Sequence, residues 1–139
     1  MVEKIKRINK MKKPTILALV VEDEEVLSAL IKKKFERENI EVVCARTADD
    51  GLKILKERGK VDFIWLDHYL LGDKDGIDFV KEVKKNKDWQ DIPIFVVSNT
   101  AGPEKKKLYC DLGITKYYVK ADYQLDEIIE EIRKILKQK

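Results

Sequence analysis

The sequence predicts an α/β fold with a five-stranded parallel sheet, strand order 2-1-3-4-5, and helices on both faces. Short, mostly apolar segments alternate five times with segments whose apolar residues recur at helical spacing. A continuous apolar run is typical of a strand buried on both faces, and regular strand–helix alternation favours a parallel sheet. The chain has 139 residues, 44% hydrophobic and 40% charged, which is enough for one domain with a core.

The expected strands are the mostly apolar runs of the sequence. They stand at 15–21, 40–45, 61–66, 92–98 and 115–119. Pro93 suits the beginning of its strand, because proline is tolerated there. The order 2-1-3-4-5 is the common arrangement for five such units, and it makes the first and third strands neighbours.

The expected helices follow the strands in turn. They cover 24–39, 47–59, 76–86, 103–113 and the segment from Asp122 to the C-terminus. Thr47 with Asp50 three residues later is close to a capping box, and Gly59 stands at a C-cap position. Pro103 in the first turn and Gly113 at the end bound the fourth helix.

The net charge of +3 is concentrated at the N-terminus. Residues 1–13 hold six Lys/Arg and one Glu, so the remainder of the chain carries −2. We expect residues 1–13 to be a basic, flexible extension and residues 14–139 to form the domain. Val2, Ile5 and Ile8 recur at helical spacing, so docking of the extension on a partner stays open beside simple disorder.

The cysteines and the hydropathy pattern limit the environment of the protein. Cys44 and Cys110 lie far apart without a CxxC spacing, and a single histidine cannot complete a typical zinc site. Free thiols are typical of a reducing compartment, so we expect a cytoplasmic location. The longest apolar run, "ILALVV", is too short to span a membrane.

Polar side chains follow four of the five expected strands. Glu22 and Asp23 follow the first strand, Asp67 the third, Ser98 the fourth and Lys120 the fifth. Parallel strands end at the same edge of a sheet, where open α/β folds bind ligands. Because the first and third strands would lie about 5 Å apart, the three carboxylates are expected to converge.

This set of side chains indicates what the site could bind and which reaction it suits. Three close carboxylates cannot all stay ionised unless a cation joins them, and oxygen ligands in a solvent-facing site favour Mg²⁺. Ser98 and Lys120 could then bind further oxygens of an anion gathered by the ion. The arrangement suits phosphoryl transfer, with Asp67 as the central nucleophile.

Four segments at these strand ends carry a family resemblance. They are "VVEDEE", "FIWLDHYLLGDKDG", "IPIFVVSNT" and "YYVKAD". In this order they resemble the receiver domain of two-component response regulators, the CheY-like, flavodoxin-like proteins that histidine kinases phosphorylate on aspartate. The resemblance covers about residues 14–137.

The resemblance implies a metal site around the phospho-accepting Asp67. Asp23 would bind Mg²⁺ directly, Glu22 through water, and Tyr69 through its backbone carbonyl. Leu71 stands near the place of a usual proline, and Gly76 falls one residue later than usual, so the contact from Tyr69 depends on an altered loop.

The resemblance also implies phosphoryl-binding and switch residues. The hydroxyl of Ser98, the backbone N–H of Asn99 and the ammonium of Lys120 would hold the phosphoryl group, and Tyr117 would turn inward after Ser98 shifts. Asn99 replaces a more usual alanine. Ala121 replaces a proline that commonly follows a cis peptide, which leaves the peptide geometry after Lys120 open.

The implied function is that of a stand-alone receiver in a phosphorelay, not of an enzyme. Its donor would be a sensor histidine kinase or a His-containing phosphotransfer protein. Its output would be protein contacts or onward phosphotransfer, through a face formed by Lys105–Lys107, Tyr109, Tyr117 and the last helix. Direct nucleic-acid binding is not expected, and a phosphorylation-dependent homodimer stays open.

Other interpretations compete with this one. A degenerate receiver would act as a phosphorylation-independent binding module. A phosphatase of the haloacid dehalogenase type needs a second aspartate where Tyr69 stands, and a flavin or nucleotide binder needs a glycine-rich loop after the first strand. Among the remaining residues, we expect His68 in an exposed loop, Trp65 in the core and Trp89 in packing.

Overall fold

The computed structural model of the chain describes residues 16–99 and 102–137. The expected N-terminal extension, residues 1–13, lies outside the described residues. The strands are β1 (Ile16–Val21), β2 (Ile40–Ala45), β3 (Phe63–Leu66), β4 (Ile94–Ser98) and β5 (Lys116–Val119). The helices are α2 (Glu25–Arg37), α3 (Ala48–Arg58), α4 (Gly76–Lys85), α5 (Pro103–Asp111) and α6 (Leu125–Lys137), with a 3₁₀ turn at Lys120–Asp122.

The five strands form one parallel sheet in the order β2-β1-β3-β4-β5, which confirms the predicted fold class. The last residue of β1, Val21, pairs with Ala45 of β2 and with Leu66 of β3. At the other side of the sheet, Ser98 of β4 pairs with Val119 of β5. The ends of β1, β2 and β3 are therefore level, and β4 continues two residues past Val96, the partner of Leu66. The residues that follow the strands meet at one edge.

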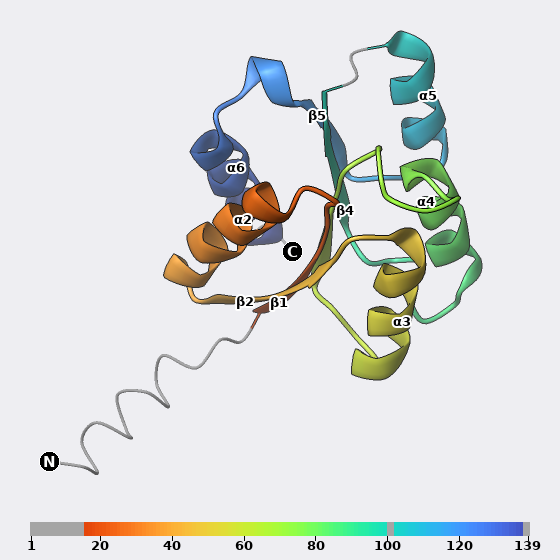
Figure 1. Cartoon of the computed structure of the whole chain (residues 1–139), viewed down its shortest axis with the longest axis horizontal. Coiled ribbons are helices and arrows are strands. Elements are labelled where there is room, and N and C mark those ends of the chain that lie inside the picture. Colours follow the sequence, from red (N-terminus) through yellow and green to blue (C-terminus); the bar gives the residue numbers. More distant parts are fainter. Residues whose placement is uncertain (1–15, 100–101, 138–139) are drawn as a thin grey trace, which may run out of the picture.

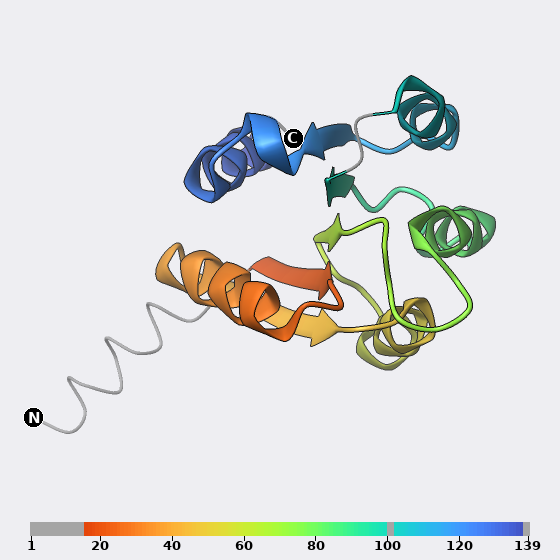
Figure 2. The same cartoon turned by 45° about the horizontal axis from the view of Figure 1, so that its top comes forward.

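Helices cover both faces of the sheet. Helices α2 and α6 lie on one face, and α3, α4 and α5 lie on the other (Figures 1 and 2). Each face has its own apolar core. Trp65 and Phe35 belong to the core under α2 and α6, whereas Leu55 and Phe79 belong to the core under α3 and α4. Trp65 is completely buried, as predicted, and Trp89 packs against the second core.

Local signals explain where several helices begin and end. The side chain of Thr47 accepts a hydrogen bond from the N–H of Asp50 at 3.0 Å, which caps α3. Gly59 ends this helix with φ +78°, a backbone conformation that favours glycine. Asp75 and Asp78 form a reciprocal capping box at the start of α4.

Two strands begin two residues later than the sequence predicted, and the last helix begins three residues later. β3 begins at Phe63. Asp62, just before it, bonds Leu17 twice: its N–H donates to the carbonyl of Leu17 at 2.8 Å, and its side-chain Oδ2 accepts the N–H of Leu17 at 2.8 Å. β4 begins after Pro93, which has no N–H for the ladder. The expected start of the last helix at Asp122 is occupied by the 3₁₀ turn.

Candidate functional site

Asp67 and Glu22 lie side by side because the strands before them are paired. The N–H of Asp67 donates to the carbonyl of Val21 at 2.9 Å, and the N–H of Glu22 donates to the carbonyl of Ala45 at 2.9 Å. The chain thus leaves β1 and β3 in register. Carboxylate oxygens of Glu22, Asp23 and Asp67 all lie within 4.8 Å of one another, as predicted from the strand ends.

Two of the three acids are buried. Glu22 is 1% exposed and Asp67 is 6% exposed, whereas Asp23 is half-buried. Lys120 brings one positive charge to them: its Nζ lies 3.2 Å from Glu22 Oε1 and 3.8 Å from Asp67 Oδ2. The second oxygen of Glu22 accepts the N–H of Glu24 at 3.1 Å. One ammonium group therefore contacts two of the three carboxylates, and the guanidinium of Arg46 donates to the backbone carbonyl of Asp23 at 3.2 Å and 3.3 Å.

This imbalance appears in the pKa values of the acids. Burial, followed by the charge of Asp67, raises the pKa of Glu22 to about 7, against partial compensation by the Glu24 N–H and by Lys120. Burial also raises the pKa of Asp67, and Lys120 opposes that shift. The site therefore favours either a bound proton or an additional cation.

The donor set fits a hard divalent cation. All three side chains offer carboxylate oxygens, which Mg²⁺ prefers, and Asp23 keeps the cluster open to solvent so that an ion could retain water ligands. The carbonyl of Tyr69 belongs to the same turn as Asp67, and the Tyr69 side chain is 54% exposed.

Ser98 is the last residue of β4, and Tyr117 lies within the neighbouring strand β5. Ser98 is completely buried and Tyr117 is 6% exposed, so the aromatic ring is turned inward. Burial raises the pKa of Tyr117, and a hydrogen bond with Ser98 opposes the shift. Asn99 is exposed directly after Ser98. The two predicted switch residues are thus already in contact.

The expectation for His68 was wrong. Its side chain is buried, with 3% of the residue exposed, and its Nδ1 lies 2.6 Å from the hydroxyl of Tyr109. Burial lowers the pKa of His68, and the charge of Lys105 acts in the same direction. The sequence shows only that a polar residue directly follows Asp67. This signal does not predict the contact with Tyr109.

The expected output face also needs a correction. Tyr109 is completely buried and Tyr117 is 6% exposed, so neither belongs to an exposed contact surface. Lys106, Lys107 and Leu108 of the same helix are exposed, and Lys105 is half-buried with its Nζ 3.3 Å from the hydroxyl of Tyr69.

The loop after β5 has an ordinary peptide geometry. The part of the chain that the structure describes contains no cis peptide, so the Lys120–Ala121 bond is trans. Lys120 nevertheless reaches Glu22 and Asp67 from the first residue of the 3₁₀ turn. Replacement of the usual proline by Ala121 therefore does not prevent the predicted contact.

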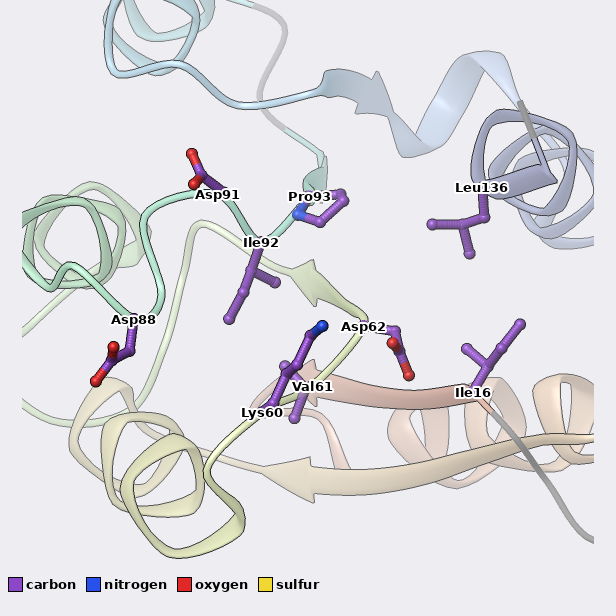
Figure 3. A pocket seen from close by; sticks show the side chains of 9 residues that line it. All are labelled: Ile16, Lys60, Val61, Asp62, Asp88, Asp91, Ile92, Pro93 and Leu136. Carbon is purple, nitrogen blue, oxygen red and sulfur yellow. The ribbon is translucent and has the colours of Figure 1, made fainter. Parts of the chain in front are cut away.

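A cavity of about 590 Å³ lies at the opposite end of the sheet from Asp67 (Figure 3). Its lining comes from residues that begin or precede β1, β3 and β4 and from the end of α6: Ile16, Lys60, Val61, Asp62, Asp88, Asp91, Ile92, Pro93 and Leu136. The cavity is therefore separate from the acidic cluster. Cys44 and Cys110, at two other places, are free and exposed.

The fold and the acidic cluster agree with the comparison to known families. The chain belongs to the family of the response regulator receiver domain, whose sequence model matches residues 18–133. This family is a signalling module of two-component systems, and its members bind Mg²⁺ at an acidic pocket. Glu22, Asp23 and Asp67 form an acidic cluster here.

Curated relatives are similar over most of this chain. The KDP operon transcriptional regulatory protein KdpE of Escherichia coli K12 is 31% identical over 102 residues, which cover 73% of this chain and 43% of that protein. The two-component response regulator ORR8 of Oryza sativa subsp. indica is 28% identical, and 84% of it is covered. The chain thus spans less than half the length of the transcriptional regulator KdpE.

Solved structures show the same fold. The receiver domain of the Francisella response regulator 1452 superposes with a TM-score of 0.77 and 25% identity, covering 89% of this chain and 98% of that one. The chemotaxis protein CheY4 of Vibrio cholerae superposes with a TM-score of 0.77 at 21% identity. The match covers 86% of this chain and 97% of that one. None of the described helices has the length and apolar character of a membrane span.

Proposed function

We propose that this domain accepts a phosphoryl group on Asp67 from a phosphohistidine, in a Mg²⁺-dependent reaction. The observation that carries the proposal is the convergence of three carboxylates with the ammonium of Lys120 at one edge of the sheet. Phosphoryl transfer depends mainly on positioning and on charge neutralisation, which this arrangement provides.

The transfer itself needs little more than a well-placed carboxylate. An oxygen of Asp67 forms a bond to phosphorus as the N–P bond of the donor histidine breaks, and the electron pair returns to that nitrogen. Bound Mg²⁺ would neutralise the phosphoryl oxygens. Lys120 already lies 3.8 Å from Asp67 and would bind one of these oxygens.

The remaining roles follow from position. Asp23, the most exposed of the three acids, would bind the metal directly and Glu22 would do so through water, with the Tyr69 carbonyl as a further ligand. Ser98 and the N–H of Asn99 would hold the phosphoryl group. Movement of Ser98 would then reach Tyr117, with which it shares a hydrogen bond.

The biological setting is proposed from the family. The donor would be a sensor histidine kinase or a His-containing phosphotransfer protein. The response would pass through protein contacts or onward phosphotransfer, on the exposed residues of α5 and on α6, without direct nucleic-acid binding. We propose a cytoplasmic protein whose receiver domain promotes only its own phosphorylation and dephosphorylation.

The test is intact mass after incubation with Mg²⁺ and acetyl phosphate or phosphoramidate. We expect the wild-type protein to gain one phosphoryl group and Asp67→Asn to gain none while keeping the unfolding curve of a folded protein. Asp73→Asn is the matched control, because Asp73 is an exposed acid in the same loop and should not affect the gain. A wild type that binds Mg²⁺ but gains no mass from either donor would favour a degenerate receiver.

A further inference from the structure

Helix α5 is attached to the body of the domain through one buried side chain. Of its 9 residues only Tyr109 is buried. The N-cap position is Gly102, so no side chain caps the start of this helix. Tyr109 is completely buried in the core that α3 and α4 cover. The placement of α5 therefore depends on what surrounds the ring and the hydroxyl of Tyr109.

The hydroxyl of Tyr109 meets the turn that follows Asp67. It lies 2.6 Å from Nδ1 of His68, and both residues are buried. A buried polar group is costly without a partner, so each of these side chains depends on the other. On its other side, Nε2 of His68 lies 3.9 Å from Oδ2 of Asp75, the N-cap residue of α4.

Gly76 allows this contact to be tight. A Cβ at this position would lie 2.2 Å from the hydroxyl oxygen of Tyr109. It would also lie 3.1 Å from the carbonyl oxygen of Asp67 and 3.1 Å from the Cα of His68. The N–H of Gly76 donates to the carbonyl of His68 at 2.9 Å. Close-packed groups transmit displacement, so a movement of the turn reaches Tyr109 directly.

A second contact joins the same two segments at the surface. Nζ of Lys105 lies 3.3 Å from the hydroxyl of Tyr69 and 5.0 Å from the centre of its ring. The Tyr69 side chain is exposed, and exposed cation–π contacts contribute little free energy. The buried pair of His68 and Tyr109 is therefore the main connection between the turn and α5.

We propose that the hydrogen bond between His68 and Tyr109 couples the state of Asp67 to the position of α5. The inference rests on the proposed function. Phosphorylation replaces a carboxylate by a larger and more negatively charged group, so the turn of Asp67 and His68 has different favoured positions in the two states. Tyr109 is a positioning residue that carries this difference to the exposed face of α5.

This connection is separate from the pair of Ser98 and Tyr117. That pair joins the last residue of β4 to a residue within β5, whereas His68 and Tyr109 join the turn after β3 to α5. The two routes touch, because the rings of Tyr109 and Tyr117 lie 5.6 Å apart between centroids. A tilt of either ring therefore affects the other, and α5 receives the signal from two sides.

The experiment compares the full chain with Tyr109→Phe, His68→Leu and the double variant, each with Mg²⁺ and with or without beryllium fluoride as a mimic of the phosphoryl group. Backbone amide chemical shifts of α5 report the coupling, and those of Ser98 and Lys120 report binding. Removing both polar partners leaves no unpaired buried group, so the double variant should unfold near the wild-type midpoint. We expect its α5 shift changes to fall about threefold or more while binding persists.

Tyr118→Phe is the matched control. Tyr118 is also completely buried, and its hydroxyl bonds Glu131 at 2.9 Å on the other side of the sheet. We expect its α5 response to equal that of the wild type. A double variant that binds beryllium fluoride and keeps the full α5 response would overturn the coupling alone. If that variant does not fold, Tyr109→Phe decides by the same criterion.

A wild type without any response to beryllium fluoride and acetyl phosphate would overturn the proposed function, and the coupling with it. The two failures are distinguishable, because the first appears only in the double variant and the second already in the wild type.

Discussion

Opposing electrostatic effects act on Glu22. Burial and the nearby Asp67 raise its pKa to about 7, although Lys120 and the N–H of Glu24 stabilise its charged form. In the metal-free protein a carboxylate with such a pKa binds a proton near neutral pH. Mg²⁺ must displace this proton, so metal affinity is expected to rise with pH.

Glu22 is expected to raise the free energy of unfolding of the metal-free protein as the pH falls, whereas His68, whose folded-state pKa is lowered, contributes in the opposite direction. The folded-state pKa of Glu22, about 7, lies above its ordinary value of 4.5, so between these values only the folded state binds the proton. Stability therefore falls as pH rises through this window and is constant above it. Asp67, whose pKa is also raised, acts in the same direction.

Urea unfolding without Mg²⁺, at several pH values from about 5 to about 8, measures this slope. Glu22→Gln should flatten the curve and raise stability at the alkaline end by on the order of 1–3 kcal/mol. Asp73→Asn, which changes an exposed acid of the loop after β3, should keep the slope. An unchanged slope in Glu22→Gln would show that another group causes the pH dependence.

Strand ends predicted most of the site at the level of single residues. Glu22, Asp67 and Lys120 were expected together because each directly follows a strand, and their contacts confirm the convergence. The prediction that His68 is exposed was wrong for a physical reason. A residue in a turn can point outward or inward, and its burial depends on Tyr109, which lies 41 positions later in the sequence.

At the scale of elements, local interactions decide where helices begin and end. The sequence predicted three helix ends: the cap of α3 by Thr47, its end at Gly59 and the start of α5 at Pro103. These ends could be predicted because the atoms involved are close in sequence. The start of β3 could not be predicted from the sequence. Asp62 interacts with Leu17, 45 positions away, so the boundary depends on tertiary contact.

Thr47→Ala should lower the free energy of unfolding by about 1 kcal/mol, because the N–H of Asp50 loses its acceptor. Thr47→Ser keeps the hydroxyl and is the matched variant. Its expected loss in the free energy of unfolding is only a few tenths of the loss in Thr47→Ala. Urea denaturation measures both. Equal losses in the two variants would assign the effect to the methyl group of Thr47 instead of the cap.

At the scale of the whole molecule, the sheet separates two cores that share its strands. Trp65 and Phe63 point to the face of α2 and α6, whereas Ile64 and Leu66 of the same strand point to the face of α3 and α4. Loss of packing on either face disturbs the strands that both cores use. We therefore expect the domain to unfold in one cooperative step.

Leu55→Ala and Ile31→Ala test this expectation, because each empties a fully buried site on a different face. Each variant should lose about 2–5 kcal/mol. Far-ultraviolet circular dichroism and tryptophan fluorescence should give coincident transitions in both. Val26→Ala, at a side chain that is 78% exposed, should change stability by less than about 0.5 kcal/mol. Separate transitions would mean that the two faces unfold independently.

The sequence by itself determined the alternation of strands and helices, the strand order and the acids at the strand ends. These features depend on residue spacing and on the limited topologies of parallel sheets. Tertiary structure alone decided which distant side chains meet. Lys120 reaches Glu22 across 98 positions, and Tyr109 turns inward to His68. Such contacts depend on how helices pack on the finished sheet, and spacing along the chain carries no record of that packing.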